Sequence, residues 1–174
     1  KSQRLIADFM QRQAEGDKAG LEDPLNIGQT FLELTQKMMA DPAKMANAQM
    51  ALWQDYLKLW QNAAERQSQP DTEPLVKPES GDNRFKHHDW NDSQVFDFIK
   101  QSYLLTSDWM LRTVADVEGM DEKARHKANF YTKQFADALS PTNFLATNPQ
   151  VLEATVESGG DNLVKGLDNL LKDL

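Results

Sequence analysis

The sequence predicts an all-α fold, and three observations support that prediction. Apolar residues recur every three or four positions along most of the chain, which is the spacing that places them on one side of an α-helix. Asp–Pro and Asn–Pro pairs precede several of these stretches, where Asp or Asn can cap a helix and proline suits its first turn. No stretch alternates apolar and polar residues for long enough to predict a β-strand.

The first third of the chain predicts two helices that start at Asp–Pro pairs, after a short amphipathic stretch from Leu5 to Met10. The starts are Asp23-Pro24 and Asp41-Pro42. Two apolar stripes follow them: Ile27, Phe31, Leu34 and Met38, and then Met50, Trp53, Leu57, Trp60 and Ala64. Intervals of three and four are typical of helices that pack lengthwise against another helix.

The second half predicts four further helices. The first is capped by Asn91 or Asp92, ends near Gly119, and carries one long stripe: Phe96, Ile99, Tyr103, Thr106, Met110, Val114 and Val117. Asp121 opens the next helix, which Ser140-Pro141 stops. Asn148-Pro149 starts a short helix that Gly159-Gly160 ends, and an amphipathic helix with leucines at 163, 167, 170 and 174 finishes the chain.

The stretch around Pro70, Pro74 and Pro78 predicts a linker. Prolines remove backbone donors and block helix propagation, and the stretch offers few apolar residues to bury. We therefore expect a helical arm over 1–66, an extended linker over 67–90 and a second helical unit over 91–174.

Composition excludes several classes of function. The chain carries 27 acidic and 19 basic residues, with a formal net charge of −8 and no dense basic run, so we expect no nucleic-acid partner. No apolar run approaches the length of a transmembrane helix. The chain starts at Lys1 without a charged-then-apolar leader, which predicts no secretory signal. It contains no cysteine, which removes any thiol nucleophile and fits a cytoplasmic protein.

The candidate catalytic and metal-binding groups are few. His87, His88 and His126 are the only histidines. A metal site needs three or four converging ligands, and the sequence places no Cys or further His near His87-His88-Asp89, so we expect a solvated or locally hydrogen-bonded loop there. His126 is expected at the surface, and Ser140 before a proline is expected in a turn. We expect no catalytic residue, no metal and no cofactor.

The aromatic residues Trp53, Tyr56 and Trp60 are the most informative candidates for binding. With Met50 and Leu57 they form either the internal core of the arm or a surface for a partner, a second copy or a granule. A helix hairpin has little opposing surface to cover two Trp and one Tyr, which bring roughly 150–250 Å² each. The two interpretations stay open on the sequence alone.

Several phrases in the second half resemble the N-terminal region of class I polyhydroxyalkanoate synthases. They are Arg84-Phe85 leading to Trp90, then Gln101 to Thr106, then Ser140-Pro-Thr-Asn-Phe-Leu-Ala-Thr-Asn-Pro149, and finally Gly160 with Asn162-Leu163, Gly166 and Asn169-Leu170. The resemblance covers roughly residues 84–174, and a match of ten consecutive residues with two prolines is specific.

The resemblance implies a non-catalytic region that precedes an α/β-hydrolase-type domain with a Cys-Asp-His triad. Such synthases polymerise (R)-3-hydroxyacyl-CoA into polyester in the cytoplasm, release CoA, and stay on the growing granule. The implied roles of this region are dimerisation, association with the granule surface and docking of an accessory granule protein. The alternative is a freestanding, phasin-like amphipathic granule protein.

A second group of apolar residues is expected to contact the catalytic domain of such a parent. Phe144 and Leu145 lie between two prolines and are too interrupted to form a helix, and the last helix presents leucines that lack an evident partner. These candidates are Phe144, Leu145, Leu163, Leu167 and Leu170.

Overall fold

The computed structural model describes residues 27–173, and all regular structure within that range is helical. The predicted stretch Leu5–Met10 and the predicted start at Asp23-Pro24 lie outside the described residues, as do the side chains of Leu167 and Leu170. The helices are α2 (Ile27–Ala40), α3 (Pro42–Ser68), α4 (Asp89–Asp92), α5 (Gln94–Ala115), α6 (Glu122–Ala138), the 3-10 turn η1 (Pro141–Asn143), α7 (Pro149–Glu157) and α8 (Asp161–Asp173). The all-α prediction is confirmed for this part of the chain.

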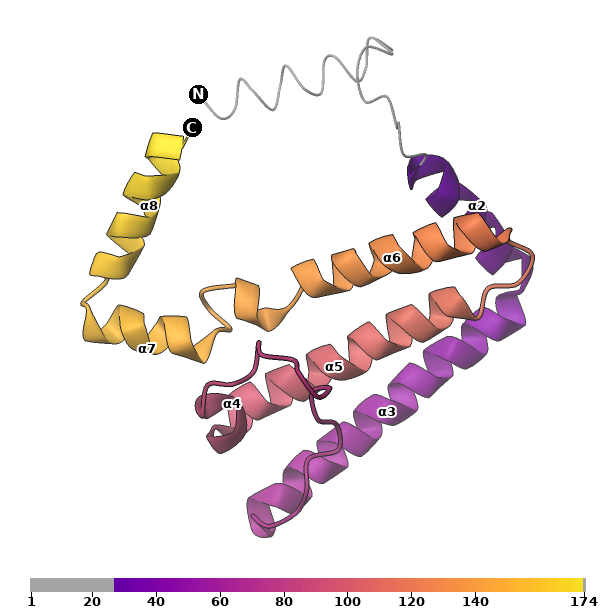
Figure 1. Ribbon diagram of the computed structural model, residues 1–174. Helices are drawn as coiled ribbons and strands as arrows, with labels where there is room; N and C mark the ends of the chain where they lie inside the picture. The colour runs from indigo at the N-terminus through magenta and orange to yellow at the C-terminus, as the bar shows by residue number, and fades with distance from the viewer. Residues whose placement is uncertain (1–26, 174) are drawn as a thin grey trace.

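Helix α5 lies in the middle of a layer, with α3 on one side and α6 on the other (Figure 1). Successive contacts between α3 and α5 show that the two helices are antiparallel. The indole N–H of Trp109 donates to the carbonyl of Ala48 at 2.8 Å, whereas at the opposite end the Trp60 ring lies 4.6 Å from the Phe98 ring. The stripe predicted from Phe96 to Val117 lies on this central helix as far as Val114, and Val117 follows its end.

Helix α2 contacts both α3 and α6. Leu34 of α2, Val114 of α5 and Ala128 of α6 form a small buried core, and Phe31, Met38, Val117 and Met120 pack around it. The last two residues belong to the turn between α5 and α6. This cluster holds together the end of the layer where the α2–α3 corner meets the α5–α6 turn.

Three predicted caps are confirmed. The carboxylate of Asp41 accepts from the backbone N–H of Lys44, Asp121 accepts in the same way from Ala124, and the side chain of Asn148 accepts from Gln150 and Val151. Each cap satisfies backbone donors that an isolated first turn leaves free.

The predicted ends of the long central helix were wrong. It starts at Gln94, after the separate turn of helix α4, and the Asn91 side chain is occupied elsewhere because it accepts from the Lys100 ammonium at 2.8 Å. The helix ends at Ala115. Gly119, with φ of +80°, supports the turn beyond this end.

Residues 69–88 contain no helix, as the prolines predict, but they are not exposed throughout. Phe85 and the following Trp90 are 5% and 1% exposed, and their rings meet edge to face at 5.0 Å. The backbone N–H of Val76 donates to the Gln101 side chain of α5 at 3.0 Å. The segment crosses in front of α5 in Figure 1 and covers that face of the layer. The division into arm, linker and second unit stays a prediction, although α3 packs along α5.

A buried charge cluster holds this covered face together. Lys100 is 2% exposed, and its ammonium donates to the Trp90 carbonyl at 2.7 Å and lies 2.9 Å from the Asp97 carboxylate. Asp97 also pairs with Arg66 of α3 and accepts from Gln101 at 2.7 Å. Lys100 and Asp97 are tolerated in this buried position because each has several partners. Among the described helices, none has the length and apolar content needed to cross a membrane.

Candidate functional site

Helix α3 carries two interleaved apolar stripes, and only one of them packs inside the protein. Leu52, Tyr56, Leu59 and Ala63 are spaced four, three and four and face α5. Leu59 is fully buried, and the Tyr56 hydroxyl lies 2.7 Å from the Thr106 hydroxyl. The predicted association residue Tyr56 thus places its hydroxyl in the α3–α5 interface, unlike the side chains of Trp53 and Trp60.

The second stripe lies on the outside, and we call it the α3 strip. Trp53 and Trp60 are 63% and 61% exposed, and Met50 and Leu57 are exposed to a similar degree. With Ala64 they follow intervals of three, four, three and four, so they share one side of the helix. The structure thus brings four of the five predicted association residues together: Met50, Trp53, Leu57 and Trp60. More than half of each of these four side chains remains exposed among the described residues.

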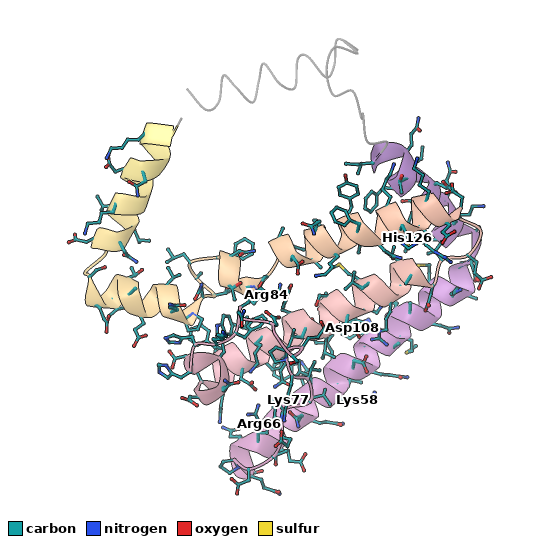
Figure 2. All side chains as sticks on the ribbon, viewed as in Figure 1. Lys58, Arg66, Lys77, Arg84, Asp108 and His126 are labelled. Atoms are coloured by element: carbon teal, nitrogen blue, oxygen red, sulfur yellow. The ribbon has the colours of Figure 1, made fainter. Side chains whose placement is uncertain are left out.

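No charged residue lies on the α3 strip. The charged residues of α3 all fall on its other sides, as helical spacing of about 100° per residue requires; they are Lys44, Asp55, Lys58, Glu65 and Arg66. Lys58 and Arg66 are labelled in Figure 2. Lys58 pairs with Asp55 at 3.0 Å, and Asp55 also lies 3.8 Å from Arg112 of α5. The neighbours of the strip are instead neutral amides, among them Gln49, Gln54, Gln61 and Gln67.

A shallow groove of about 380 Å³ lies at the C-terminal end of the α3 strip. It runs between α3 and the first turns of α5 and is lined by Trp60, Ala63, Ala64, Gln67, Gln94, Val95, Phe98 and Ile99. The Trp60 ring is held against the Phe98 ring with a tilt of 48°. This contact fixes one wall of the groove, and the small side chain of Ala64 leaves the space open.

A second apolar groove, of about 470 Å³, lies where α2, α5 and α6 meet. Its lining includes Phe31, Met110, Tyr131 and Phe135. Met110 and Val95 fall on one side of α5, because the positions between them, Ile99, Ser102 and Thr106, continue the same helical spacing. Both grooves therefore open on the side of α5 that the segment 69–88 leaves uncovered.

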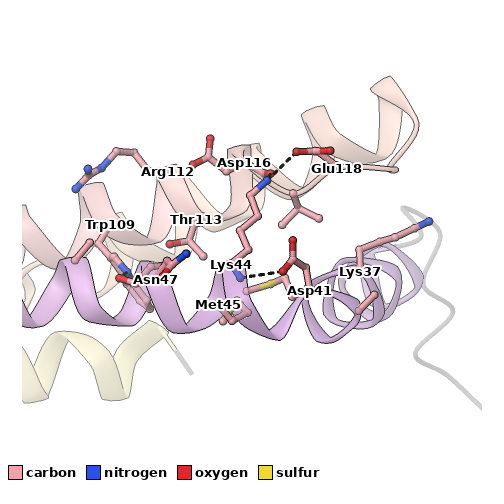
Figure 3. A pocket seen from close by; sticks show the side chains of 15 residues that line it. Lys37, Asp41, Lys44, Met45, Asn47, Trp109, Arg112, Thr113, Asp116 and Glu118 are labelled. Atoms are coloured by element: carbon pink, nitrogen blue, oxygen red, sulfur yellow. Dashed lines mark hydrogen bonds and ion pairs between the residues drawn. The ribbon is translucent and has the colours of Figure 1, made fainter.

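A third pocket, of about 410 Å³, lies between the α2–α3 corner and the end of α5 (Figure 3). Its rim is polar. The Lys44 ammonium donates to the Asp116 carbonyl at 2.6 Å and to Glu118 at 3.0 Å, and the hydrogen bond to Glu118 raises the pKa of Lys44. These contacts close the corner of the fold, and the pocket offers no nucleophile with an adjacent base.

Arg84 is the main polar tie between the segment 69–88 and the layer (Figure 2). Its guanidinium forms a bidentate pair with Asp82, with both N–O distances at 2.9 Å, and reaches Asp137 of α6 at 3.0 Å. It also donates to the Tyr103 hydroxyl at 2.8 Å. The hydrogen bond from Arg84 lowers the pKa of Asp82, and the same bond raises the pKa of Arg84. Three residues thus hold the segment 69–88 against the helical layer: Arg84, Phe85 and Trp90.

The two adjacent histidines lie at the end of this segment. One ring nitrogen each of His87 and His88 and one carboxylate oxygen of Asp89 lie within 4.8 Å of one another. His87 also meets the Glu153 carboxylate of α7 at 3.0 Å, a partner that sequence spacing did not reveal. The contact ties α7 to the segment, and the absence of a metal there stays a prediction. His126 is exposed beside Glu122, and the Ser140 hydroxyl, just before η1, lies 2.8 Å from that of Thr142 within η1.

The C-terminal candidates lie beyond α6. Phe144 and Leu145 follow η1 and are 49% and 43% exposed, and Leu163 at the start of α8 is 41% exposed. Two side-chain hydrogen bonds stabilise the turn itself: the Thr147 hydroxyl donates to the Pro141 carbonyl at 2.7 Å, and the Asn148 amide donates to the Thr142 carbonyl at 2.8 Å. This network uses the Thr147 and Asn148 side chains of the stretch from Ser140 to Pro149.

The fold and the α3 strip define a helical module with one uncharged strip on its surface. Its described residues contain no nucleophile with an adjacent base. The chain belongs to the family described as poly-beta-hydroxybutyrate polymerase (PhaC) N-terminus, which it matches over residues 81–174. The resemblance inferred from the sequence is thereby confirmed.

The curated relatives are polymerases of polyhydroxyalkanoates. The chain is 44% identical to a poly(3-hydroxyalkanoate) polymerase of Methylorubrum extorquens and 41% identical to a polymerase subunit PhaC of Rhizobium meliloti, in each case over 83% of this chain and 24% of the relative. It is 36% identical to the PhaC subunit of Cupriavidus necator, over 76% of this chain and 21% of that protein. The chain thus spans about a quarter of the length of these relatives. No solved structure matches it significantly.

Proposed function

We propose that this chain is a non-catalytic N-terminal region of a polyhydroxyalkanoate polymerase and that it serves self-association through the α3 strip. The observation that supports this proposal is the exposed, charge-free row of Met50, Trp53, Leu57 and Trp60. Cores of protein interfaces are enriched in aromatic residues and Met and depleted in charged residues. An apolar row of this kind marks an interaction site more often than a surface left in water.

The proposed setting follows from the family. The parent would polymerise (R)-3-hydroxyacyl-CoA with release of CoA in the cytoplasm, on the surface of polyester granules. This chain would contribute contacts with a second subunit, with an accessory granule protein and with the polymer surface. We expect no catalysis by the chain alone, because it contains no cysteine to act as the nucleophile of such a reaction.

Sedimentation equilibrium on the purified chain tests self-association. We expect a concentration-dependent mass above that of the monomer, and we expect Trp53→Ala and Trp60→Ala to shift the equilibrium towards monomer. Truncation of a central aromatic anchor commonly weakens an interface by about 2 kcal/mol or more, or roughly 30-fold in Kd. Phe130→Ala is the matched control, because Phe130 is an equally exposed aromatic residue on α6. A strict monomer at high concentration would contradict the proposal.

The contact with polymer is tested separately. Polyhydroxybutyrate particles are incubated with the chain and with its Trp53→Ala, Trp60→Ala double variant, and bound protein is measured after sedimentation. Binding that depends on the α3 strip in a chain that stays monomeric favours the phasin-like alternative, in which the surface serves the granule and not a second subunit. If neither the chain nor the double variant binds the particles, the granule is no longer part of the proposal.

The apolar residues after α6 are proposed to face the rest of the parent polymerase. Phe144, Leu145 and Leu163 are partly exposed although the turn that carries them is firmly hydrogen-bonded. Crosslinking of full-length parent through a photoreactive residue at position 145 should yield products within the same polypeptide. Crosslinks only to water or to unrelated proteins would contradict this assignment.

A further inference from the structure

The order of side chains along the α3 strip is close to a mirror image of itself. Leu57 lies at its centre, Trp53 and Trp60 lie four residues before and three after it, and Met50 and Ala64 lie seven before and seven after. At 1.5 Å per residue, Met50 and Ala64 are each about 10 Å from the centre along the helix axis. Only the outermost pair differs strongly in size: Met50 is long, and Ala64 is small.

We propose that two copies of this chain pair antiparallel through the α3 strip, with a two-fold axis beside Leu57 and with Met50 of each copy inserted into the groove next to Ala64 of the other. This inference rests on the self-association proposed above and specifies its geometry. An isologous two-fold contact uses the same patch on both subunits, and the antiparallel arrangement then places Trp53 opposite Trp60 of the second copy in two equivalent pairs.

The groove of about 380 Å³ supports the antiparallel arrangement over the parallel one. In a parallel pair, Ala64 would face Ala64 beside two open grooves, and two Met50 side chains would crowd together at the other end. In the antiparallel pair, each Met50 meets Ala64, Trp60 and Val95, which line that groove. Met suits such a site because its unbranched chain adapts to irregular space. Trp60 is already fixed against Phe98, so little side-chain freedom is lost on binding.

The charge distribution on α3 permits a second copy to approach along this surface. Each chain carries a net charge of −8, so two copies repel one another over most orientations. The α3 strip is free of charge, and the pairs that hold the charges of α3, such as Lys58 with Asp55 and Arg66 with Asp97, lie on its other sides. Two copies can therefore approach along the strip without desolvating a charge.

The size of the strip is consistent with a reversible dimer. Each Trp brings roughly 150–250 Å² of surface when fully covered, and more than half of Trp53 and Trp60 is still exposed. These two residues supply about a quarter to a third of the ~800 Å² per partner of a standard interface. Met50, Leu57 and Val95 add to that area. We therefore expect exchange between monomer and dimer in place of an obligate assembly.

Disulfide crosslinking tests the geometry with little background, because the chain contains no cysteine. Single cysteines are introduced as Met50→Cys, Leu57→Cys and Ala64→Cys, and Lys58→Cys on the charged side of α3 is the control. Each variant, and an equimolar mixture of the Met50 and Ala64 variants, is oxidised at a concentration at which the parent chain is dimeric. Disulfides form only where Cα atoms come within about 4.4–6.8 Å.

The antiparallel pair predicts a distinct pattern. On a denaturing, non-reducing gel, the Leu57→Cys chain runs at the dimer mass and the mixture of Met50→Cys and Ala64→Cys gives a mixed disulfide. The Met50→Cys and Ala64→Cys variants alone, and the Lys58→Cys chain, run at the monomer mass. If Met50→Cys and Ala64→Cys each crosslink alone and their mixture gives no preference for the mixed product, the pair is parallel. The inference is then wrong, while self-association stands.

If the parent chain has the monomer mass at every concentration, the proposed function itself fails. A dimeric chain in which none of these variants crosslinks places the interface elsewhere and overturns the inference.

Discussion

The hydroxyl oxygens of Tyr56 on α3 and Thr106 on α5 lie 2.7 Å apart. Both hydroxyls also reach the Ser102 carbonyl, Thr106 at 2.8 Å and Tyr56 at 3.5 Å. This contact shows which side of α3 packs against α5. Tyr56 belongs to the side that holds the fold together, whereas Trp53 and Trp60, three residues before it and four after it, belong to the side that faces outwards.

Tyr56→Phe should affect stability and not association. The substitution removes one hydrogen bond in a half-buried interface, for which we expect a loss of about 1 kcal/mol in the free energy of unfolding. Urea denaturation followed by circular dichroism measures this loss, and sedimentation equilibrium should give the same association constant as the parent chain. A weakened association with unchanged stability would return Tyr56 to the outer surface.

Lys100→Ala should destabilise the fold strongly. The substitution removes a 2% exposed ammonium group that bonds the Trp90 carbonyl and pairs with Asp97. Asp97 keeps Arg66 and Gln101 as partners, so we expect the loss to be about 2–4 kcal/mol, at the lower end of what breaking a buried pair causes. Lys58→Ala is the control, because its ion pair with Asp55 is exposed and should contribute less than about 1 kcal/mol. Equal losses in both variants would contradict the role of the buried cluster.

Arg84→Ala should release the segment 69–88 from the layer. Its guanidinium joins Asp82, Tyr103 and Asp137, and we expect a loss of about 1–3 kcal/mol together with faster hydrogen exchange of the Val76 amide. Arg84→Lys should recover only part of the loss, since an ammonium group cannot form the bidentate pair with Asp82. Full recovery by Lys would show that charge alone is sufficient.

Asp82 should contribute to the loss of stability in acid. The hydrogen bond from Arg84 lowers the pKa of Asp82 in the folded state, so the charged carboxylate favours folding. This contribution is complete above the unfolded-state pKa of about 3.9 and disappears as the pH falls through the lower folded-state value. The free energy of unfolding of Asp82→Asn should therefore fall less steeply than that of the parent chain below about pH 4.

Glu73→Gln is the control for this pH dependence. The pKa of Glu73 is also lowered, by its hydrogen bond with Lys77, but both side chains are largely exposed to water. Screening by solvent makes such a pair weak, so the acid profile of Glu73→Gln should follow that of the parent chain. If the two variants have the same profile, the Arg84–Asp82 pair has no special role.

Local sequence signals predicted the helices well. Asp41, Asp121 and Asn148 cap as expected, because a cap depends on residues two or three positions away. The same local logic failed at Asn91. Its side chain accepts from Lys100, and a contact with the next helix does not follow from spacing around position 91.

The candidate site was only partly predictable for a similar reason. The stripes Leu52–Tyr56–Leu59–Ala63 and Met50–Trp53–Leu57–Trp60–Ala64 have the same helical spacing, so periodicity alone does not tell which of them packs against α5. The burial of Phe85 and Trp90 was not predicted. It depends on side chains of α5 that bind the non-helical segment 69–88: Gln101 accepts from the Val76 N–H, and the Tyr103 hydroxyl accepts from Arg84.

The most direct test of the central claim is fluorine NMR of the chain labelled with 5-fluorotryptophan. Its four Trp residues give four resonances, which Trp→Phe variants assign, and the H₂O-to-D₂O shift of each line reports exposure to solvent. The resonances of Trp53 and Trp60 should show exposure at low concentration and lose it as the chain associates, whereas the line of the buried Trp90 should stay constant. An increase in mass without any change at Trp53 and Trp60, or solvent-shielded lines for both at all concentrations, would contradict the account.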